Sequence, residues 1–277
     1  MKEKDKKKMS SKKKKLLMGA AAAIAVIFGA GFIGDNCLTV SKYELTSDKV
    51  SEKIRIVNVS DLHNKRFGKE QSRLTETVLS LEPDIIVMTG DIAEHPSLAK
   101  NAYTFIKNVS DTAPVYYSPG NHEHRLSSEN FNRLMDGITE AGGTVLTDEY
   151  AVEQVKGNHI NIIGLDDISL NNETLKELCA QVDHDNYTAV LAHEPQYIEN
   201  YQAQDCELVM SGHAHGGQII LPFIGPVFAP DQLFFPKYTE GVHTANGTSL
   251  VISRGLANNA PCPRFFNPPE IVVIDIE

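Results

Sequence analysis

The chain of 277 residues has 42% hydrophobic and 22% charged residues, an ordinary globular composition that is long enough for one large core. Its formal net charge is −10; the first fifteen residues carry +7, because nine Lys are offset only by Glu3 and Asp5, so the remainder carries −17. That acidic balance argues against nonspecific binding to nucleic acid, which needs a basic surface.

The N-terminal region predicts a membrane anchor. Residues 16–33, LLMGAAAAIAVIFGAGFI, are 18 consecutive uncharged, mostly apolar positions, just enough to cross a bilayer as a helix. The Lys-rich block before them is expected to stay in the cytoplasm, which places the rest of the chain outside it. A cleaved signal peptide shares both features, but the length of the run and the lack of a clear A-x-A site favour an uncleaved anchor.

The expected organisation is a single-pass protein of the cell membrane. It comprises a basic cytoplasmic tail over 1–15, a transmembrane signal-anchor over 16–34 and one folded, extracytoplasmic domain over 38–277. The four cysteines, Cys37, Cys179, Cys206 and Cys262, form no C-x-x-C pair, so a zinc knuckle is not indicated. A location outside the cytoplasm would permit a disulfide, but the sequence leaves the pairing open.

Beyond the anchor, apolar strand patterns alternate with amphipathic helix patterns. The strand patterns cover 37–45, 54–60, 84–90, 114–119, 160–165, 188–193, 206–212, 249–254 and 271–276. The helix patterns cover 69–81, 97–109, 128–141 and 171–181. Such alternation indicates crossover connections between largely parallel, buried strands, and therefore an α/β fold.

Polar residues that are able to bind metal follow five of these strands directly. They are Asp61 and His63, then Asp91, then Asn121, His122 and Glu123, then His193, and finally His213 and His215. In an α/β fold, ligands gather at the carboxyl ends of the strands. The pattern therefore brings these side chains to one edge of the sheets.

Taken singly, each of these motifs has a plainer explanation. An Asp-x-His or a Gly-Asp is common in turns, and a lone His193 suits a core histidine that is already hydrogen-bonded. His213 and His215 are stronger, because residues i and i+2 of an extended segment share a face, and two adjacent imidazoles suggest an ion. The order and placement of all five motifs together favour a metal site.

The chemistry of the set fits a pair of divalent ions. Imidazole suits Mn, Fe, Zn or Ni, and a carboxylate is able to bridge two ions about 3.5–4 Å apart. Two such ions with only two Asp ligands leave a net positive site, which attracts an anion such as a phosphate. The metal identity stays open.

At this point the motifs Asp61-x-His63, Gly90-Asp91, 120–123 (GNHE), His193 and 212–215 (GHAH) resemble the signature of calcineurin-like metallophosphoesterases. The match spans roughly 54 to 255. The N-terminal anchor, GHAHGGQ and the closing SRG…PRFFNPPEIVVI resemble the membrane-associated phosphodiesterase subgroup. The resemblance implies a four-layer αββα sandwich with two facing mixed sheets.

The resemblance also implies roles for single residues. One ion would be held by Asp61, His63 and His215, and the other by Asn121, His193 and His213, with Asp91 bridging. His122 would donate a proton to the leaving oxygen. Glu123, which stands where the family often has Asp, would orient His122. His124 has no assigned role.

The implied reaction is phosphodiester hydrolysis by a hydroxide that bridges two divalent metal ions. An alternative is a pyrophosphatase acting on a lipid-linked or nucleotide-sugar-lipid substrate. A further alternative is an inactive, membrane-tethered binding protein, although all seven ligand positions are filled. The expected partners are a phosphoester substrate, which is amphiphilic in one interpretation, and the lipid bilayer. The chain is expected to be a monomer.

One further stretch, residues 219–236 (IILPFIGPVFAPDQLFFP), is apolar and has Asp231 as its one charge. Its four prolines make it a poor regular strand or helix. One interpretation is that it packs on the core. The other is that Phe223, Ile224, Phe228, Phe234 and Phe235 contact lipid or the acyl part of a substrate.

Overall fold

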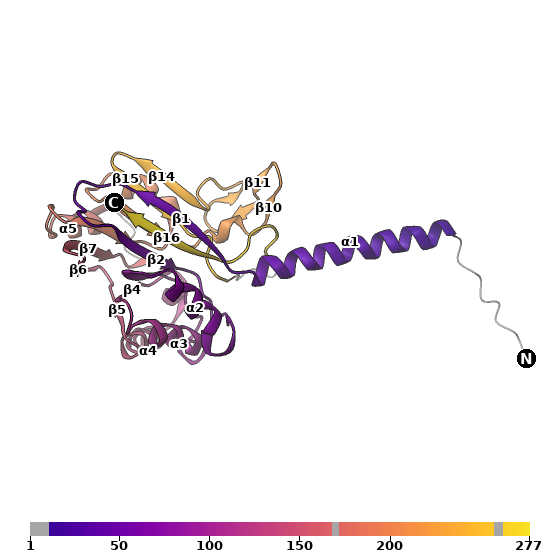
Figure 1. Cartoon of the computed structure of the whole chain (residues 1–277), viewed down its shortest axis with the longest axis horizontal. Coiled ribbons are helices and arrows are strands. Elements are labelled where there is room, and N and C mark those ends of the chain that lie inside the picture. The colour runs from indigo at the N-terminus through magenta and orange to yellow at the C-terminus, as the bar shows by residue number, and fades with distance from the viewer. Residues whose placement is uncertain (1–10, 168–171, 258–262) are drawn as a thin grey trace, which may run out of the picture.

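The computed structural model describes residues 11–167, 172–257 and 263–277. Two six-stranded mixed sheets form the body (Figure 1). The first runs in the order β1 (Thr39–Leu45), β16 (Glu270–Ile276), β2 (Ile54–Val59), β3 (Ile85–Thr89), β4 (Val115–Ser118), β5 (Gly143–Val145). The second runs β14 (Gly241–Ala245), β15 (Thr248–Ile252), β9 (Leu208–Ser211), β8 (Tyr187–Leu191), β7 (Asn158–Gly164), β6 (Glu149–Val155).

Three layers of buried apolar side chains separate the sheets and helices. Between the sheets, Ile56 and Val87 of the first sheet belong to the same cluster as Ile162 and Met210 of the second. The outer face of the first sheet packs on α2 (Ser72–Ser80), α3 (Lys100–Val109) and α4 (Ser128–Glu140). The outer face of the second packs on α5 (Asn172–Cys179) and α6 (Ile198–Tyr201). This arrangement confirms the predicted α/β layers with mixed sheets.

The sequence pattern explains which strands lie where. β3, β8 and β9 are continuous runs of buried residues, as expected for strands covered on both faces. β6 instead alternates between exposed and half-buried positions, as expected for an edge strand. The sequence analysis did not identify β5, β6 or β14, which are one edge strand of the first sheet and both edge strands of the second.

Helix α1 (Ser11–Asn36) contains the segment predicted to cross the membrane and projects from the body (Figure 1). Among the residues whose placement is described, no helix is both long and apolar enough to cross a membrane. The structure therefore does not support the transmembrane expectation. Cys37, Cys179 and Cys206 are free thiols, while Cys262 and residues 1–10 of the expected basic tail lie outside the described residues.

Two short hairpins follow the last histidine motif. They pair β10 (Ile220–Leu221) with β11 (Gly225–Pro226), and β12 (Phe228–Ala229) with β13 (Leu233–Phe234). The region that the sequence analysis judged too rich in proline for regular structure is therefore built from strands of two residues each. Figure 1 shows β10 and β11 at the end of the body from which α1 projects.

Candidate metal centre

The predicted ligands meet at one edge, where β2, β3 and β4 of the first sheet end beside β8 and β9 of the second. The two sheets are joined there by direct contacts. Nδ1 of His193 lies 2.8 Å from the carbonyl oxygen of Thr89, and the backbone N–H of His213 donates to Oδ1 of Asp61 at 3.0 Å. Residues from opposite sheets therefore form one continuous cluster.

The first group of possible ligands is Asp61, His63 and His215. Nε2 of His215 lies 3.8 Å from Oδ1 of Asp61, and the rings of His63 and His215 have centroids 5.2 Å apart. Among the residues that the structure describes, Nε2 of His63 is buried without a hydrogen-bond partner. In the neutral ring that carries its proton on Nδ1, this nitrogen has the lone pair that a cation needs.

The second group is Asp91, His193 and His213. Nε2 of His193 lies 3.3 Å from Oδ2 of Asp91 and 3.3 Å from Nδ1 of His213. The same Oδ2 atom of Asp91 lies 3.6 Å from Nε2 of His63, which belongs to the first group. Asp91 therefore stands between the two groups, the position that a bridging carboxylate requires.

Asn121 supports the fit of a cation. Its Oδ1 atom is buried and has no hydrogen-bond partner among the described residues. An unpaired buried carbonyl costs about 1–3 kcal/mol, and a cation bound beside it would satisfy it. The donor set of imidazole, carboxylate and amide oxygen suits divalent Mn, Fe, Zn or Ni.

The backbone around these ligands is strained. Five of the seven predicted metal ligands have positive φ angles: Asp61, His63, Asp91, His213 and His215. Left-handed geometry is uncommon for residues other than glycine and clusters at functional sites. The tight turns that follow the strands impose this geometry, so the fold holds these side chains at a cost in stability.

Two glycines allow the turns to approach one another. A Cβ atom on Gly120 would lie 2.5 Å from Oδ1 of Asp91, and one on Gly90 would lie 2.7 Å from the Cα of Gly120. Both separations are too short for real contacts. The glycines of the two motifs are therefore required by the close packing of the turns.

The structure reassigns the carboxylate that orients His122. Glu123 is fully buried and accepts hydrogen bonds from the backbone N–H groups of Gly120, Asp91 and Ile92 at 2.8–2.9 Å. Glu123 thus ties the turns together. Oε2 of Glu94 lies 2.7 Å from Nδ1 of His122, so Glu94 fills the orienting position that the sequence analysis gave to Glu123.

Glu94 and Arg125 were missed from the sequence. The other oxygen of Glu94 lies 2.7 Å from Nδ1 of His63, so one carboxylate holds both rings. These two histidines lower the pKa of Glu94 to about 2, so it is ionised at neutral pH. Nη1 of Arg125 lies 2.9 Å from Nε2 and 3.4 Å from Nδ1 of His122, so the guanidinium is close to both nitrogens of that ring.

Two further residues, His124 and Asp231, contact different parts of this region. His124 contacts Asp166 through Nε2 and stacks on Phe131 with ring centroids 4.9 Å apart, away from the two ligand groups, so its contacts are structural. Asp231, at the second hairpin, places Oδ2 2.9 Å from Nε2 of His213. A carboxylate on the second nitrogen of a ligating histidine commonly fixes the tautomer and the ring orientation.

The pKa values of the candidate ligands are shifted in both directions. Burial would raise the pKa of Asp91, but His193, His63 and His122 together hold that pKa well below its usual value. Burial lowers the pKa of His193, but Asp91 raises it well above its usual value. Burial, together with His193, lowers the pKa of His213 to about 4. Burial, together with His63, lowers the pKa of His215 well below its usual value. Both latter rings are neutral near pH 7 and are able to offer a lone pair.

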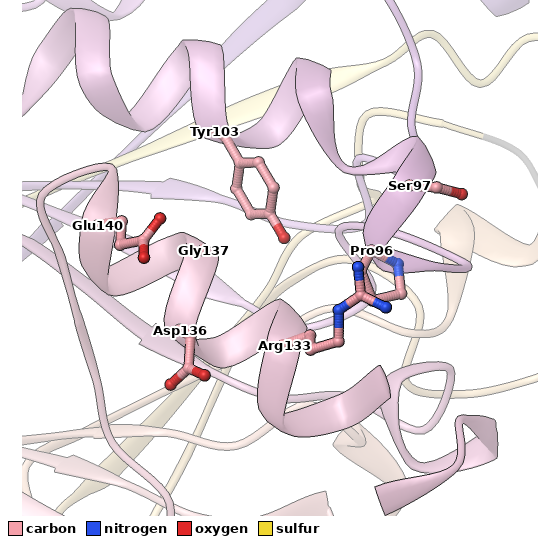
Figure 2. Close-up of a pocket in the computed structure, with 7 residues that line it drawn as sticks. All are labelled: Pro96, Ser97, Tyr103, Arg133, Asp136, Gly137 and Glu140. Carbon is pink, nitrogen blue, oxygen red and sulfur yellow. The ribbon is translucent and has the colours of Figure 1, made fainter. Parts of the chain in front are cut away.

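A hollow separate from the ligand groups lies between α3 and α4 (Figure 2). Tyr103 points from α3 toward Gly137 of α4, and Arg133, Asp136 and Glu140 line the opposite wall. Its lining contains no histidine or cysteine. It therefore lacks the imidazole and thiolate ligands that would make it a rival for the metal site.

Paired mixed sheets with candidate metal-ligand groups at their strand ends are the arrangement expected of a metal-dependent enzyme. A family model described as calcineurin-like phosphoesterase matches residues 54–217, more than half of the chain. The chain belongs to this family, and it is a metal-dependent phosphoesterase.

Relatives agree with this assignment. The metallophosphoesterase YkuE of Bacillus subtilis, itself described as uncharacterized, is 31% identical over 233 residues, which cover 80% of this chain and 79% of that protein. The phosphodiesterase YaeI of Escherichia coli is 25% identical over 216 residues, which cover 74% of this chain and 75% of that protein. The solved structure of Haemophilus influenzae NAD nucleotidase (NadN) has a TM-score of 0.53 at 15% identity, over 74% of this chain and 46% of that one, which is a likeness of fold alone.

Proposed function

We propose that the chain hydrolyses phosphodiesters with two divalent ions. The observation that carries the proposal is the position of Asp91, whose Oδ2 atom lies within 3.6 Å of His63 and within 3.3 Å of His193. One ion would be held by Asp61, His63 and His215, and the other by Asn121, His193 and His213, with Asp91 shared. When bound, divalent ions neutralise phosphoryl oxygens and lower the pKa of the attacking water.

The protein supplies the proton for the leaving oxygen from His122. Glu94 is ionised, and its Oε2 atom lies 2.7 Å from Nδ1 of His122, so it fixes the orientation of that ring. In the structure the Nε2 atom of that ring faces Nη1 of Arg125 at 2.9 Å. When Arg125 turns to a phosphoryl oxygen, Nε2 is released toward the leaving oxygen. Arg125 thereby binds the anion and His122 acts as the general acid.

The test compares three substrates with the purified full-length chain. We expect turnover of a soluble aryl phosphodiester, its loss in excess chelator and its return with Mn²⁺ or a similar ion. Full activity in excess chelator contradicts the metal mechanism. A phosphomonoester and a lipid pyrophosphate are assayed alongside, since faster turnover of the lipid pyrophosphate favours the pyrophosphatase alternative. No turnover of any substrate with any of the four metals favours the inactive binding protein.

We also propose that α1 attaches the chain to a membrane, with the catalytic body on the extracytoplasmic side. The support is the uncharged run at 16–33, the Lys-rich block before it, and the exposure of Phe28, Phe32 and Ile33 on α1. Exposed side chains of this size and apolarity are unfavourable in water. Extraction of membranes with alkaline carbonate tests the attachment, because a chain released into the supernatant is peripheral or soluble.

A further inference from the structure

The two hairpins after the histidine motif expose a concentration of large apolar side chains. They are Phe223, Ile224, Phe228, Leu233, Phe234 and Phe235, which we call the apolar hairpin surface. Phe223 is fully exposed, at 108%, and Phe235 is 68% exposed. The interpretation in which this stretch packs on the core is therefore wrong for these side chains. Large contiguous apolar patches normally mark an interaction surface.

This surface is attached directly to the metal-binding residues. β12 packs against the turn His215–Gly217, and a Cβ atom on Gly217 would lie 2.3 Å from the Cβ of Pro226. Asp231, between β12 and β13, contacts His213 at 2.9 Å. A molecule held on the hairpins would therefore lie beside the site proposed for hydrolysis.

The surface also adjoins the end of α1. Ile219 forms a β-bridge with Phe265, and the backbone N–H of Ile220 donates to the carbonyl oxygen of Phe265. Phe265 in turn packs on α1, since a Cβ atom on Gly31 would lie 3.4 Å from its ring. Phe32, the next residue of α1, is also exposed, so α1 presents apolar side chains close to the segment that pairs with the hairpins.

Cationic side chains gather at the same end of α1. Nη2 of Arg73 donates to the carbonyl oxygen of Asn36 at 3.0 Å, and Nζ of Lys65 contacts the carbonyl oxygen of Asp35. Arg66 is also exposed in this segment. Basic groups beside apolar side chains match a layer of anionic headgroups over acyl chains, whereas the acidic body as a whole would be repelled by it.

Backbone geometry adds an independent observation. Phe223, Leu233 and Phe235 have φ angles of 68°, 59° and 56°. Bulky residues rarely adopt this left-handed region, and each such case costs of the order of 1–3 kcal/mol. Because these side chains are exposed, that cost is not offset by burial within this chain. Contact with an apolar phase outside the chain would offset it.

We propose that the apolar hairpin surface docks on a lipid bilayer with anionic headgroups and presents the metal centre to phosphoesters of amphiphilic molecules in that bilayer. The substrate class rests on the proposed function, while the docking itself does not. Side chains such as Phe223 enter the boundary between headgroups and acyl chains. Asp231 keeps the second hairpin in register with His213 while the surface is engaged.

Docking is tested with a tryptophan reporter, because the natural sequence has no Trp. Phe223→Trp and, as a matched control, Tyr150→Trp on the edge strand β6 are made in the full-length chain. Each is mixed with vesicles of phosphatidylcholine and phosphatidylglycerol whose acyl chains are brominated. We expect emission of the F223W chain to shift to the blue and to be quenched, and that of the Y150W chain to stay unchanged.

Three outcomes overturn the docking proposal. They are an F223W chain whose emission is not quenched, equal quenching of both reporters, and a full-length chain that stays in the supernatant when the vesicles are pelleted. Asymmetric quenching supports the proposal, since both reporters carry the same α1. An unchanged thermal melting curve verifies that each variant is folded.

The substrate class is tested with Phe223→Asn, because Asn adopts left-handed φ more readily than Phe. We expect the ratio of the rate on a phosphodiester lipid in vesicles to the rate on a soluble diester to fall about tenfold, which corresponds to about 1.4 kcal/mol. An unchanged ratio contradicts the substrate class. If neither substrate is turned over by the unmodified chain, the proposed function fails, and the quenching result still decides the docking.

Discussion

Asp91 and His122 are neighbours in the site with different expected duties. Oδ1 of Asp91 accepts from the backbone N–H of His122 at 2.9 Å, while Oδ2 of Asp91 faces the imidazoles of both ligand groups. The closest side-chain partners of His122 are Glu94 and Arg125, which are not among the seven proposed metal ligands, and its Nε2 atom lies farther from Oδ2 of Asp91, at 3.8 Å. Substitutions at the two positions should therefore separate metal binding from proton transfer.

We predict that Asp91→Asn abolishes turnover and lowers the bound metal, because it removes the one carboxylate shared by both groups. His122→Ala should keep the metal and lose about 10²–10⁴-fold in rate, the usual range for a general acid. Metal content by elemental analysis and the rate on a soluble diester are measured for both. Equal loss of metal in the two variants would contradict the assigned roles.

Glu94 lies between His63 and His122. Its two oxygens each contact Nδ1 of a histidine, His63 or His122. Glu94→Gln retains the size of the side chain, but the amide nitrogen is a donor in place of one acceptor oxygen. We expect a loss of about 10–100-fold in metal affinity or activity, as for other carboxylates behind metal-ligating histidines. Exposed Glu177→Gln on α5 is the control, and equal behaviour of the two variants would argue against this role.

The C-terminal strand β16 is held between the edge strand β1 and β2 in the first sheet. Asp275 of β16 lies directly opposite Arg55 of β2. The guanidinium donates to both carboxylate oxygens, from Nε at 2.7 Å and from Nη2 at 2.9 Å. Arg55 also donates to the carbonyl oxygen of Leu81 at the end of α2. This pair therefore joins the C-terminal strand to the helix layer.

We predict that Asp275→Asn lowers the free energy of unfolding by about 1–3 kcal/mol at pH 7, the range for hydrogen bonds to charged groups. Hydrogen bonding to Arg55 lowers the pKa of Asp275 in the folded state. Its contribution is therefore fully present above the unfolded pKa of about 3.9 and disappears as the pH falls through the lower, folded pKa. Urea unfolding across this range should show the difference between the two chains closing in acid. A difference that grows in acid would refute the assignment.

For the whole molecule, the expected orientation follows from charge. The nine Lys of residues 1–15 should remain in the cytoplasm, so the body after α1 should face the other side of the membrane. We predict that protease added to intact cells or spheroplasts degrades the body. A body that stays protected until the membrane is lysed would place it inside and reverse the orientation. A cytoplasmic marker protein, protected in the same sample, is the control.

The sequence indicated which polar side chains gather at this edge of the sheets, because each follows an apolar run and parallel strands bring their carboxyl ends together; their roles as metal ligands stay a prediction. Glu94, Arg125 and Asp231 gave no such signal. Each is a single charged residue in a turn, and only the packing of separate turns brings it to a histidine. Glu123 was misjudged for the same reason, because its partners are backbone N–H groups of two different loops.

Edge elements were the least predictable parts of the fold. β5 has three residues and β10 to β13 have two each, too short for a period of two to be recognised. Their pairing depends on neighbours that are far away in the sequence or on a tight turn. In the segment 219–236 the sequence left two interpretations open, because apolarity alone does not distinguish a core from an exposed surface.

The junction between the sheets has a consequence for the lifetime of the protein. The candidate ligands Asp61 and Asp91 follow strands of one sheet, and His193 and His213 follow strands of the other. A cation bound by all four would therefore link the two sheets. A ligand at 100 times its dissociation constant stabilises a fold by about 2.7 kcal/mol when the unfolded chain does not bind it. Scarcity of metal would therefore lower the free energy of unfolding as well as the rate of hydrolysis. A cell that lacks the metal would then degrade more of the enzyme.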